Sequence, residues 1–279
     1  MNIHYMPINK ADTEEILLLF NNIYADYYWP NQHTLASLQE IMSYMSIDGQ
    51  LSVIMMLGKI PIGLALVARR KSRVWLYCFG IVPDKRRQGY GQALLDHIIL
   101  QCQKSQIKQI GLEVLLQNNK ARDLYYKYQF KRYCYLDSYS TMLPLKAGYY
   151  QEYQFQEKIT KSVLIRLRNQ QQSVVWSRQY STLLKRNINW SVAYYRSRPV
   201  AVLAYDSSKS LSLYRLDALD GYHAEKALHT LINVAQKNNP HCVRKVAVNI
   251  NHDSVFENRV ISNLGLKRFM RQEYLVALI

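Results

Sequence analysis

Hydrophobic and polar positions in the first half of the chain alternate between the helical period and the strand period. A first helix is predicted over 16–24, because apolar side chains recur there at helix spacing and Glu14 and Glu15 suit its first turn. Two strand-like runs, 51–57 and 62–69, are separated by Gly58-Lys59-Ile60-Pro61, which is typical of a hairpin turn. The other predicted elements of this half are a helix over 34–45, a strand over 74–82, a helix over 92–103, a strand over 110–115, a helix over 120–128 and a strand over 131–139.

The second half repeats this order. Residues 190–199 read as strand, turn and strand, and the same Ser-Val start, turn proline and later Gly-Tyr pair occur in both halves. The echo continues with a strand over 212–216, a helix over 224–236, a strand over 245–250, a helix over 254–263 and a strand over 267–275. We therefore predict two copies of one α+β domain, over 1–145 and 161–279, joined by a Tyr-rich linker over 146–160. The alternative is chance similarity between two strand-rich halves.

The totals agree with two packed domains. A chain of 279 residues with 49% hydrophobic content is long enough for two domains of roughly 150 residues each. The start of the chain lacks the basic and apolar regions of a signal peptide, and no apolar stretch approaches the roughly 18 residues needed to cross a bilayer. We expect a cytoplasmic protein with no membrane partner. The four cysteines form no Cys-x-x-Cys pair, so we expect buried, reduced thiols and no metal site.

A formal net charge of +16 favours anionic partners. These include nucleic acid, acidic membrane surfaces and phosphorylated cofactors. Charge alone does not choose among them.

Candidate chemistry is concentrated in residues 81–91, between a predicted strand and a predicted helix. Main-chain N–H groups and the helix dipole can hold a phosphate at such a junction. Gly89 and Gly91 allow the main chain to approach an anion closely, and Lys85, Arg86 and Arg87 add positive charge. A dinucleotide fingerprint is excluded because Leu stands at its third glycine position, and the Gly-x-x-x-x-Gly-Lys phosphate loop is absent.

Two motifs in this half resemble the GNAT superfamily of N-acetyltransferases. The first is the strand end Ile81-x-Pro83 followed by Arg86-x-x-Gly89-x-Gly91. The second is the family pattern Asn-x-x-Ala-x-x-Leu-Tyr-x-x-x-Gly-Phe, found here as Asn118, Ala121, Leu124, Tyr125 and Phe130, with Gln129 where glycine is usual. The tandem arrangement resembles double-domain members, including Trp176-Ser177-Arg178 at the opening of the second copy.

The resemblance implies two tandem GNAT-like domains, each a mixed, mostly antiparallel twisted sheet flanked by helices. It implies acetyl-coenzyme A as cosubstrate, with its pantetheine arm in a gap between the strands over 74–82 and 110–115, paired with main chain at Phe79 and Ile81. The cofactor-binding residues that it implies are Phe79, Gly80, Ile81, Arg86, Arg87, Gln88, Gly89, Tyr90, Gly91 and Asn118. Asn118 is expected to bond the pantetheine, to cap a helix, or both.

The resemblance also assigns Tyr125 as proton donor to the leaving thiolate. A phenol with pKa near ~10 stays protonated at neutral pH and can donate to a thiolate whose acid has pKa near ~8.5. The alternative is a tyrosine that only packs on a helix. Some family members place a basic Glu where Trp75 stands here, so the general base is open. Glu113 is a candidate for it, or a structural carboxylate paired with Arg or Lys.

The second copy departs from the cofactor motif. Ala218 stands in place of Arg86, His223 in place of Gly91, and Ile261 in place of Tyr125, while Asp217 and Asp220 occupy positions expected to be basic. Because carboxylates repel a pyrophosphate, we expect one acetyl-coenzyme A per chain, bound by the first domain.

The function expected from the sequence is therefore transfer of an acetyl group to a primary amine, by direct attack in a ternary complex in the first domain. The acceptor is an unidentified small-molecule or protein amine. Two alternatives are a non-catalytic acyl-coenzyme A sensor and a basic nucleic-acid-binding module, the latter supported by Arg69-Arg70-Lys71 with Arg73. Nucleic acid is not the expected partner, because the charges are spread along both halves and no nucleic-acid fold motif is present.

Overall fold

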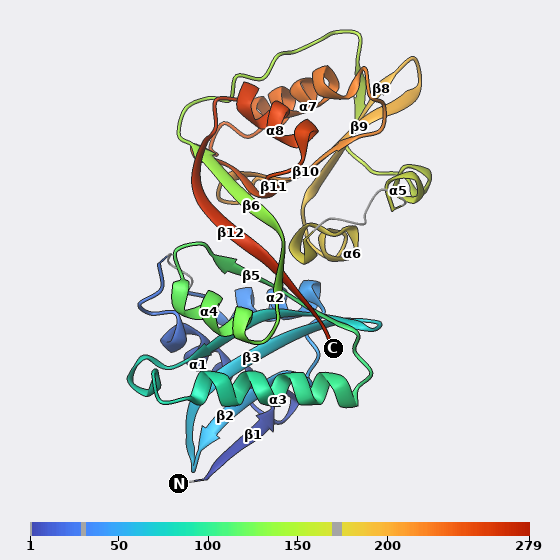
Figure 1. Ribbon diagram of the computed structural model, residues 1–279. Helices are drawn as coiled ribbons and strands as arrows, with labels where there is room; N and C mark the ends of the chain where they lie inside the picture. Colours follow the sequence, from blue (N-terminus) through green and yellow to red (C-terminus); the bar gives the residue numbers. More distant parts are fainter. Residues whose placement is uncertain (1, 29–31, 169–174) are drawn as a thin grey trace. The chain divides into compact units, whose positions relative to one another are not determined.

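The computed structural model describes residues 2–28, 32–168 and 175–279, and the chain divides into two compact units (Figure 1). Unit 1 contains Met1–Tyr133 and the C-terminal Tyr274–Ile279, and unit 2 contains Cys134–Glu273. The linker predicted over 146–160 does not coincide with this division. The reason is that β6 (Lys131–Thr141) and β12 (Lys267–Leu278) each cross a unit boundary, so the end of the chain returns to complete unit 1.

Unit 1 is a mixed sheet in the order β1-β2-β3-β4-β5, followed by the C-terminal end of β12. β1–β2, β2–β3 and β3–β4 are antiparallel, and β4–β5 is parallel. Its strands are β1 (Ile3–Pro7), β2 (Val53–Leu57), β3 (Ile60–Arg70), β4 (Arg73–Ile81) and β5 (Gln109–Leu115), and its helices are α1 (Thr13–Ile23), α2 (Leu35–Met45), α3 (Tyr90–Lys104) and α4 (Asn119–Lys127), with 3₁₀ turns η1 (Ile8–Lys10) and η2 (Pro83–Lys85). The short, half-exposed β1 was not predicted from the pattern.

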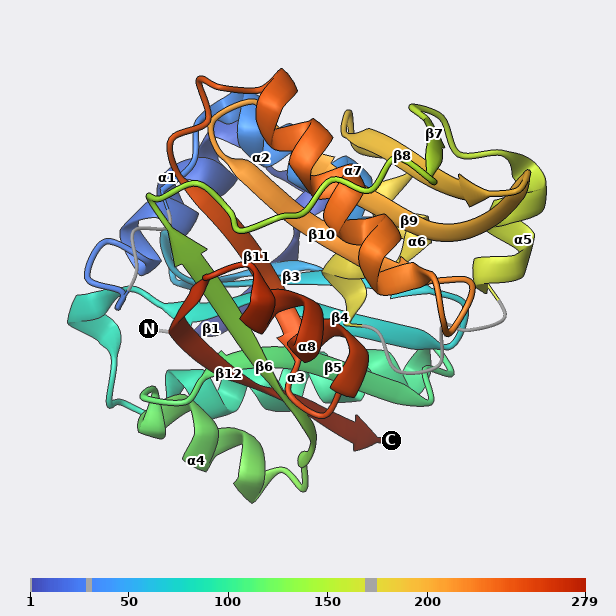
Figure 2. The same cartoon turned by 90° about the horizontal axis from the view of Figure 1, so that it is seen from above.

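The core of unit 1 is built around β3, which is buried without interruption from Ile62 to Ala68. A strand with no alternation of exposed and buried positions must be covered on both faces. Figure 2 shows the helices that cover the two faces of β3 and β4: α1 and α2 lie on one face, and α3 lies on the other. The four cysteines of the chain are buried thiols and not disulfides.

Unit 2 repeats this architecture in the order β6-β11-β10-β9-β8-β7, with the N-terminal part of β12 beside β6. β10–β11 is parallel, and β7–β8, β8–β9, β9–β10 and β6–β11 are antiparallel. Its other elements are β7 (Gln154–Gln156), β8 (Asn189–Tyr195), β9 (Arg198–Asp206), β10 (Leu211–Ala218), β11 (Lys245–Asn251), α5 (Lys161–Arg168), α6 (Tyr180–Leu183), α7 (Ala224–Asn238), α8 (Val255–Asn263) and the 3₁₀ turn η3 (Trp176–Arg178).

β9 is buried from Val200 to Tyr205, and its alternate side chains enter two different clusters, because helices cover both faces of unit 2. Val202 and Ala204 pack in a cluster with α5 and α6, whereas Ala201 and Leu203 pack in a second cluster with α7. The predicted linker over 146–160 is part of this unit: Tyr153 is 5% exposed, and β7 pairs with β8. The fold is therefore α+β with two repeated units, as the order of elements predicted.

Candidate functional site

The first feature of the site is a widening gap between β4 and β5. Their parallel pairing begins at Arg73–Gln109 and ends at Leu76–Leu112, although β4 continues to Ile81. The pairing of β4 with β3 shifts at the same place, so that Tyr77 is left out of register. The predicted separation of these two strands is therefore present.

Main-chain groups of β4 line this gap. The N–H of Val82 donates to the carbonyl of Ile62 on β3 at 2.9 Å. Because alternate residues of a strand direct their main-chain groups to opposite neighbours, those of Phe79 and Ile81 point to the β5 side. These are the two residues predicted to pair with the pantetheine arm.

The loop after β4 presents main-chain donors to open space. Arg87 and Gly89 adopt left-handed φ angles of 64° and 83°, and α3 begins directly afterwards at Tyr90. Left-handed residues before a helix N-terminus turn successive N–H groups toward one point, where an anion can be bound. A Cβ built on Gly89 would meet nothing within 4 Å, so the space beside this residue is open. Arg87 and Gln88 are exposed in the same loop. A Cβ built on Gly91 would lie 3.9 Å from a Leu124 methyl group.

Arg86 is engaged with protein groups on the other side of the loop. Its Nε donates to the carbonyl of Ile81 at 2.9 Å, and Nη2 donates to the carbonyl of Ile23 at 2.8 Å. The guanidinium also pairs with both carboxylate oxygens of Asp26, at 2.7 and 2.9 Å. Arg86, one of the positively charged residues predicted at this loop, therefore holds the loop against the end of α1. No motif in the sequence pointed to Asp26.

Tyr125 lies at the wide end of the gap. It is the seventh residue of α4, it is 6% exposed, and its ring centroid lies 6.0 Å from that of Phe79 and 5.5 Å from that of Phe130. Burial raises the pKa of Tyr125, and the neighbouring Tyr27 and Cys78 raise it further. Its phenol is therefore protonated at neutral pH, as a proton donor must be.

Two further predicted residues have clear structural roles. Asn118 caps α4, because its side-chain oxygen accepts from the N–H of Ala121 at 3.2 Å. Gly80 allows α1 to pack on β4, since a Cβ there would lie 2.3 Å from the Cγ2 of Ile23. The capping alternative for Asn118 is thus present, and its contact with a cofactor stays a prediction.

Glu113 and Trp75 lie on the two strands that separate. Glu113 is half-buried on β5, one residue beyond the last paired position. Trp75 is buried, with its ring edge-on to Tyr274 at 5.0 Å and against the backbone of Gly111. The position at which some family members carry a Glu as general base is therefore filled here by the apolar packing of Trp75. The role of Glu113 as general base stays a prediction.

The basic run Arg69-Arg70-Lys71 lies apart from this loop. Its two arginines end β3 and Lys71 begins the turn to β4, at the end of β4 opposite to Ile81. Arg69 Nη1 is 3.7 Å from an Asp48 oxygen. In the part of the chain that the structure describes, no group of three or more His, Cys, Asp or Glu side chains is placed to hold a metal, and no helix is long and apolar enough to span a membrane.

Comparison with known proteins identifies the family of this site. Residues 18–130 match the family model for the acetyltransferase (GNAT) family. Unit 1 carries a GNAT acetyltransferase domain. No curated protein matches the chain.

Solved structures show that the whole chain has the tandem GNAT fold. A tandem GNAT protein from the clavulanic acid biosynthesis pathway, solved without acetyl-coenzyme A, matches with a TM-score of 0.73 and 12% identity, over 99% of this chain and 98% of that one. A GCN5-related N-acetyltransferase from Sphaerobacter thermophilus matches with a TM-score of 0.73 and 11% identity, over 99% and 95%. One from Anabaena variabilis matches with a TM-score of 0.65 and 10% identity, over 99% and 72%.

The chain departs from the GNAT motif at Gln129, and the backbone conformation there explains why the motif has glycine. Gln129, where the motif has glycine, adopts a left-handed φ of 59°. Glycine accepts this angle without strain, whereas another residue pays roughly 1–2 kcal/mol. The glycine of the family motif therefore fits the left-handed backbone turn after α4, which Gln129 adopts here.

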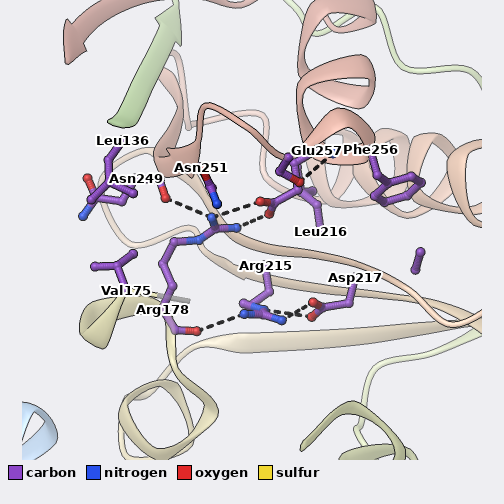
Figure 3. A pocket seen from close by; sticks show the side chains of 12 residues that line it. Leu136, Val175, Arg178, Arg215, Leu216, Asp217, Asn249, Asn251, Phe256 and Glu257 are labelled. Carbon is purple, nitrogen blue, oxygen red and sulfur yellow. Dashed lines mark hydrogen bonds and ion pairs between the residues drawn. The ribbon is translucent and has the colours of Figure 1, made fainter. Parts of the chain in front are cut away.

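The second GNAT-like unit has a gap at the same place in its sheet. β10 and β11 pair in parallel from Leu211–Lys245 to Leu213–Ala247 and then separate. A cavity of about 220 Å³ lies beyond this point (Figure 3). It is lined by residues of β10, β11, α8 and η3, including Arg178, Arg215, Asp217, Asn249 and Glu257.

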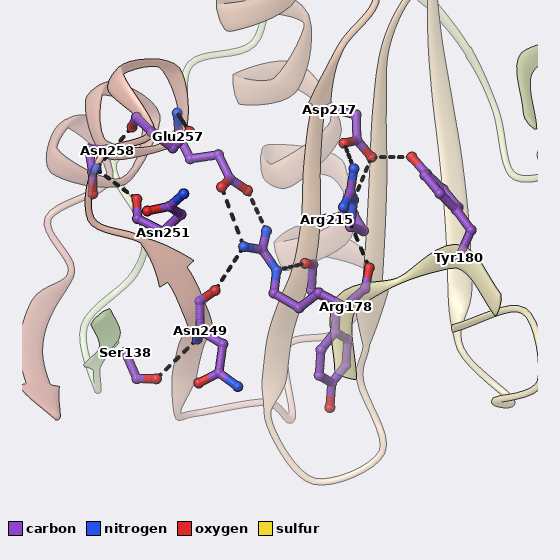
Figure 4. Close-up of polar contacts among 11 residues, drawn as sticks. Ser138, Arg178, Tyr180, Arg215, Asp217, Asn249, Asn251, Glu257 and Asn258 are labelled. Atoms are coloured by element: carbon purple, nitrogen blue, oxygen red, sulfur yellow. Dashed lines mark hydrogen bonds and ion pairs between the residues drawn. The ribbon is translucent and has the colours of Figure 1, made fainter. Parts of the chain in front are cut away.

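The side chain of Arg178 bridges this second gap (Figure 4). Its Nε donates to the carbonyl of Tyr214 on β10 at 2.5 Å, and its Nη1 donates to the carbonyl of Asn249 on β11 at 2.9 Å. The guanidinium also pairs with Glu257 of α8. Arg178 thus bonds main-chain groups on both strands, where a pantetheine arm would lie in a cofactor-binding unit.

The loop of unit 2 is also occupied by its own carboxylate. Asp220 accepts hydrogen bonds from the N–H groups of Tyr222 and His223, at 2.8 and 2.7 Å. These bonds lower the pKa of Asp220. The donors that would face a phosphate are therefore already paired, and buried Ile261, the seventh residue of α8, stands where α4 has Tyr125.

Proposed function

We propose that unit 1 transfers an acetyl group from acetyl-coenzyme A to a primary amine by direct attack in a ternary complex. The observation that carries this proposal is the open loop around Gly89, placed between the gap in the sheet and the N-terminus of α3. A pyrophosphate is the group that such a junction suits, because it combines main-chain donors with the positive end of a helix dipole. Exposed Arg87 adds charge at its rim.

Each part of the cofactor has matching groups in this unit. The pyrophosphate meets the N–H groups of 87–91, and the pantetheine arm pairs with the main chain of Phe79 and Ile81. The carbonyl of Ile81 accepts from Arg86, so its N–H is the group that we assign to the thioester oxygen, where negative charge develops.

The proposed reaction needs two proton movements. The amine nitrogen attacks the thioester carbon, the C–S bond breaks, and the thiolate takes a proton from the Tyr125 hydroxyl. The attacking amine gives up its proton to a general base, for which Glu113 is the candidate, directly or through water.

Acetyl-coenzyme A binding is tested by thermal unfolding of the full chain. Ligand at about 100 times its Kd should stabilise the protein by about 2.7 kcal/mol. Gly89→Leu should abolish this stabilisation, because a side chain at φ 83° strains the loop and fills its open side.

Gly221→Leu is the matched control, since Gly221 occupies the corresponding loop of unit 2 and is also open within 4 Å. We expect it to leave the ligand effect unchanged and titration calorimetry to give one site per chain. Absence of stabilisation in the intact protein would refute acetyl-coenzyme A binding, and two sites per chain would refute the assignment to unit 1 alone.

The acceptor class is tested by a screen that reads released coenzyme A thiol. A protein of net charge +16 is a poor match for polycationic aminoglycosides. The candidates are small amines, amino acid derivatives, and protein N-termini or lysines.

A further inference from the structure

The cofactor loop is tied to the end of α1 by one guanidinium. Arg86 bonds the carbonyl of Ile81 at the end of β4, the carbonyl of Ile23 at the end of α1, and both oxygens of Asp26. A bidentate pair fixes the direction of the guanidinium as well as its distance. The loop, β4 and the segment after α1 are therefore held at one point.

The ion pair between Arg86 and Asp26 is exposed, so its role is to position the loop and not to stabilise the fold. The side chains of Arg86 and Asp26 are 37% and 55% exposed, and exposed ion pairs contribute little to the free energy of unfolding. The hydrogen bond from Arg86 lowers the pKa of Asp26. The stability that this pair contributes is fully present at pH values above the ordinary pKa of Asp, and it is lost as the pH falls through the lowered pKa of Asp26. The pair is therefore intact at neutral pH.

The segment held by Asp26 reaches the reacting end of the proposed site. Tyr27 directly follows Asp26 in the sequence. Its ring lies edge-on to the ring of Tyr24, with the two ring centroids 5.0 Å apart. A hydrogen bond with the Asn118 side chain lowers the pKa of Tyr27 against the larger effect of burial, and Tyr27 in turn raises the pKa of Tyr125. The same aromatic segment therefore contacts the cap of α4 and the surroundings of the proposed acid.

We propose that Asp26 is a positioning residue that holds Arg86, so that the phosphate loop and the aromatic segment at Tyr24–Tyr27 form together. This inference rests on the proposed function of unit 1. The arrangement in unit 2 supports it: Ala218 stands in place of Arg86, so the loop whose N–H groups are paired with Asp220 also lacks the clamp.

The test is Asp26→Asn in the full chain. We expect KM for acetyl-coenzyme A to rise about tenfold with kcat changed less than about twofold, and the melting temperature without ligand to stay unchanged. The double variant Asp26→Asn/Arg86→Gln should show no further rise in KM over Arg86→Gln alone, because the two residues act through one contact. Asp84→Asn is the matched control: it removes an exposed ion pair with Lys85 at 3.0 Å in the same loop and should leave KM unchanged.

Amide hydrogen exchange separates this proposal from the proposed function. Asp26→Asn should speed exchange at 86–89 without any ligand, a result that holds whether or not acetyl-coenzyme A is the cosubstrate. Unchanged exchange, an unchanged KM, or additive effects in the double variant would each overturn the positioning role.

Discussion

Tyr125→Phe is expected to lower kcat for acetyl transfer by about 10²–10⁴-fold while acetyl-coenzyme A binding is retained. The substitution removes the hydroxyl that we assign to the leaving thiolate but keeps the ring that packs between Phe79 and Phe130. Steady-state release of coenzyme A thiol measures the loss, and the thermal shift caused by acetyl-coenzyme A measures binding.

Tyr126→Phe is the control for this prediction, because Tyr126 is the adjacent tyrosine of α4 and is 37% exposed. It should turn over like the unaltered protein. If Tyr125→Phe did so too, Tyr125 would be a packing residue. If the unaltered protein bound acetyl-coenzyme A but released no thiol with any amine, the acyl-coenzyme A sensor would be the better interpretation.

The same residue constrains the pH profile. Because burial raises the pKa of Tyr125 above its ordinary value of about 10, the phenol stays protonated up to and beyond that pH. A fall in kcat on the alkaline side below about pH 10 would therefore belong to another group.

Arg178→Ala is expected to destabilise the protein by about 3–5 kcal/mol. The side chain is 3% exposed, and its removal leaves Glu257 and the carbonyls of Tyr214 and Asn249 without their common donor. Urea denaturation of the full chain, followed by far-ultraviolet circular dichroism, measures the loss. A change below about 1 kcal/mol would show that the gap in unit 2 does not depend on Arg178.

Arg259→Ala provides the matched control. Arg259 pairs with Glu225 at 2.7 Å in the same unit, but its side chain is 55% exposed. An exposed pair contributes about 0–1 kcal/mol, because water screens the charges and already solvates them. The difference between the two variants therefore isolates the effect of burial.

Local pattern was sufficient for most of the elements and for the loop. Helices such as α1 and α3 repeat their apolar residues at the helical period. The hairpin of β2 and β3 turns at Gly58-Lys59, within the predicted turn, and β3 begins at Ile60, two residues before the predicted strand. These signals depend on neighbours within a few residues, so they can be read along the chain. β1 escaped prediction because it is short and lacks a buried face of its own.

By itself, then, the sequence determined the repeated order of elements, the GNAT motif from Ile81 to Gly91, and the loss of that motif in the second copy. The tertiary structure decided where the units divide, that Arg86 binds Asp26, and that Arg178 bridges the second gap. These contacts join residues that are 60 and 71 positions apart. Long-range pairs of this kind depend on how strands and helices close in space, and no local periodicity encodes them.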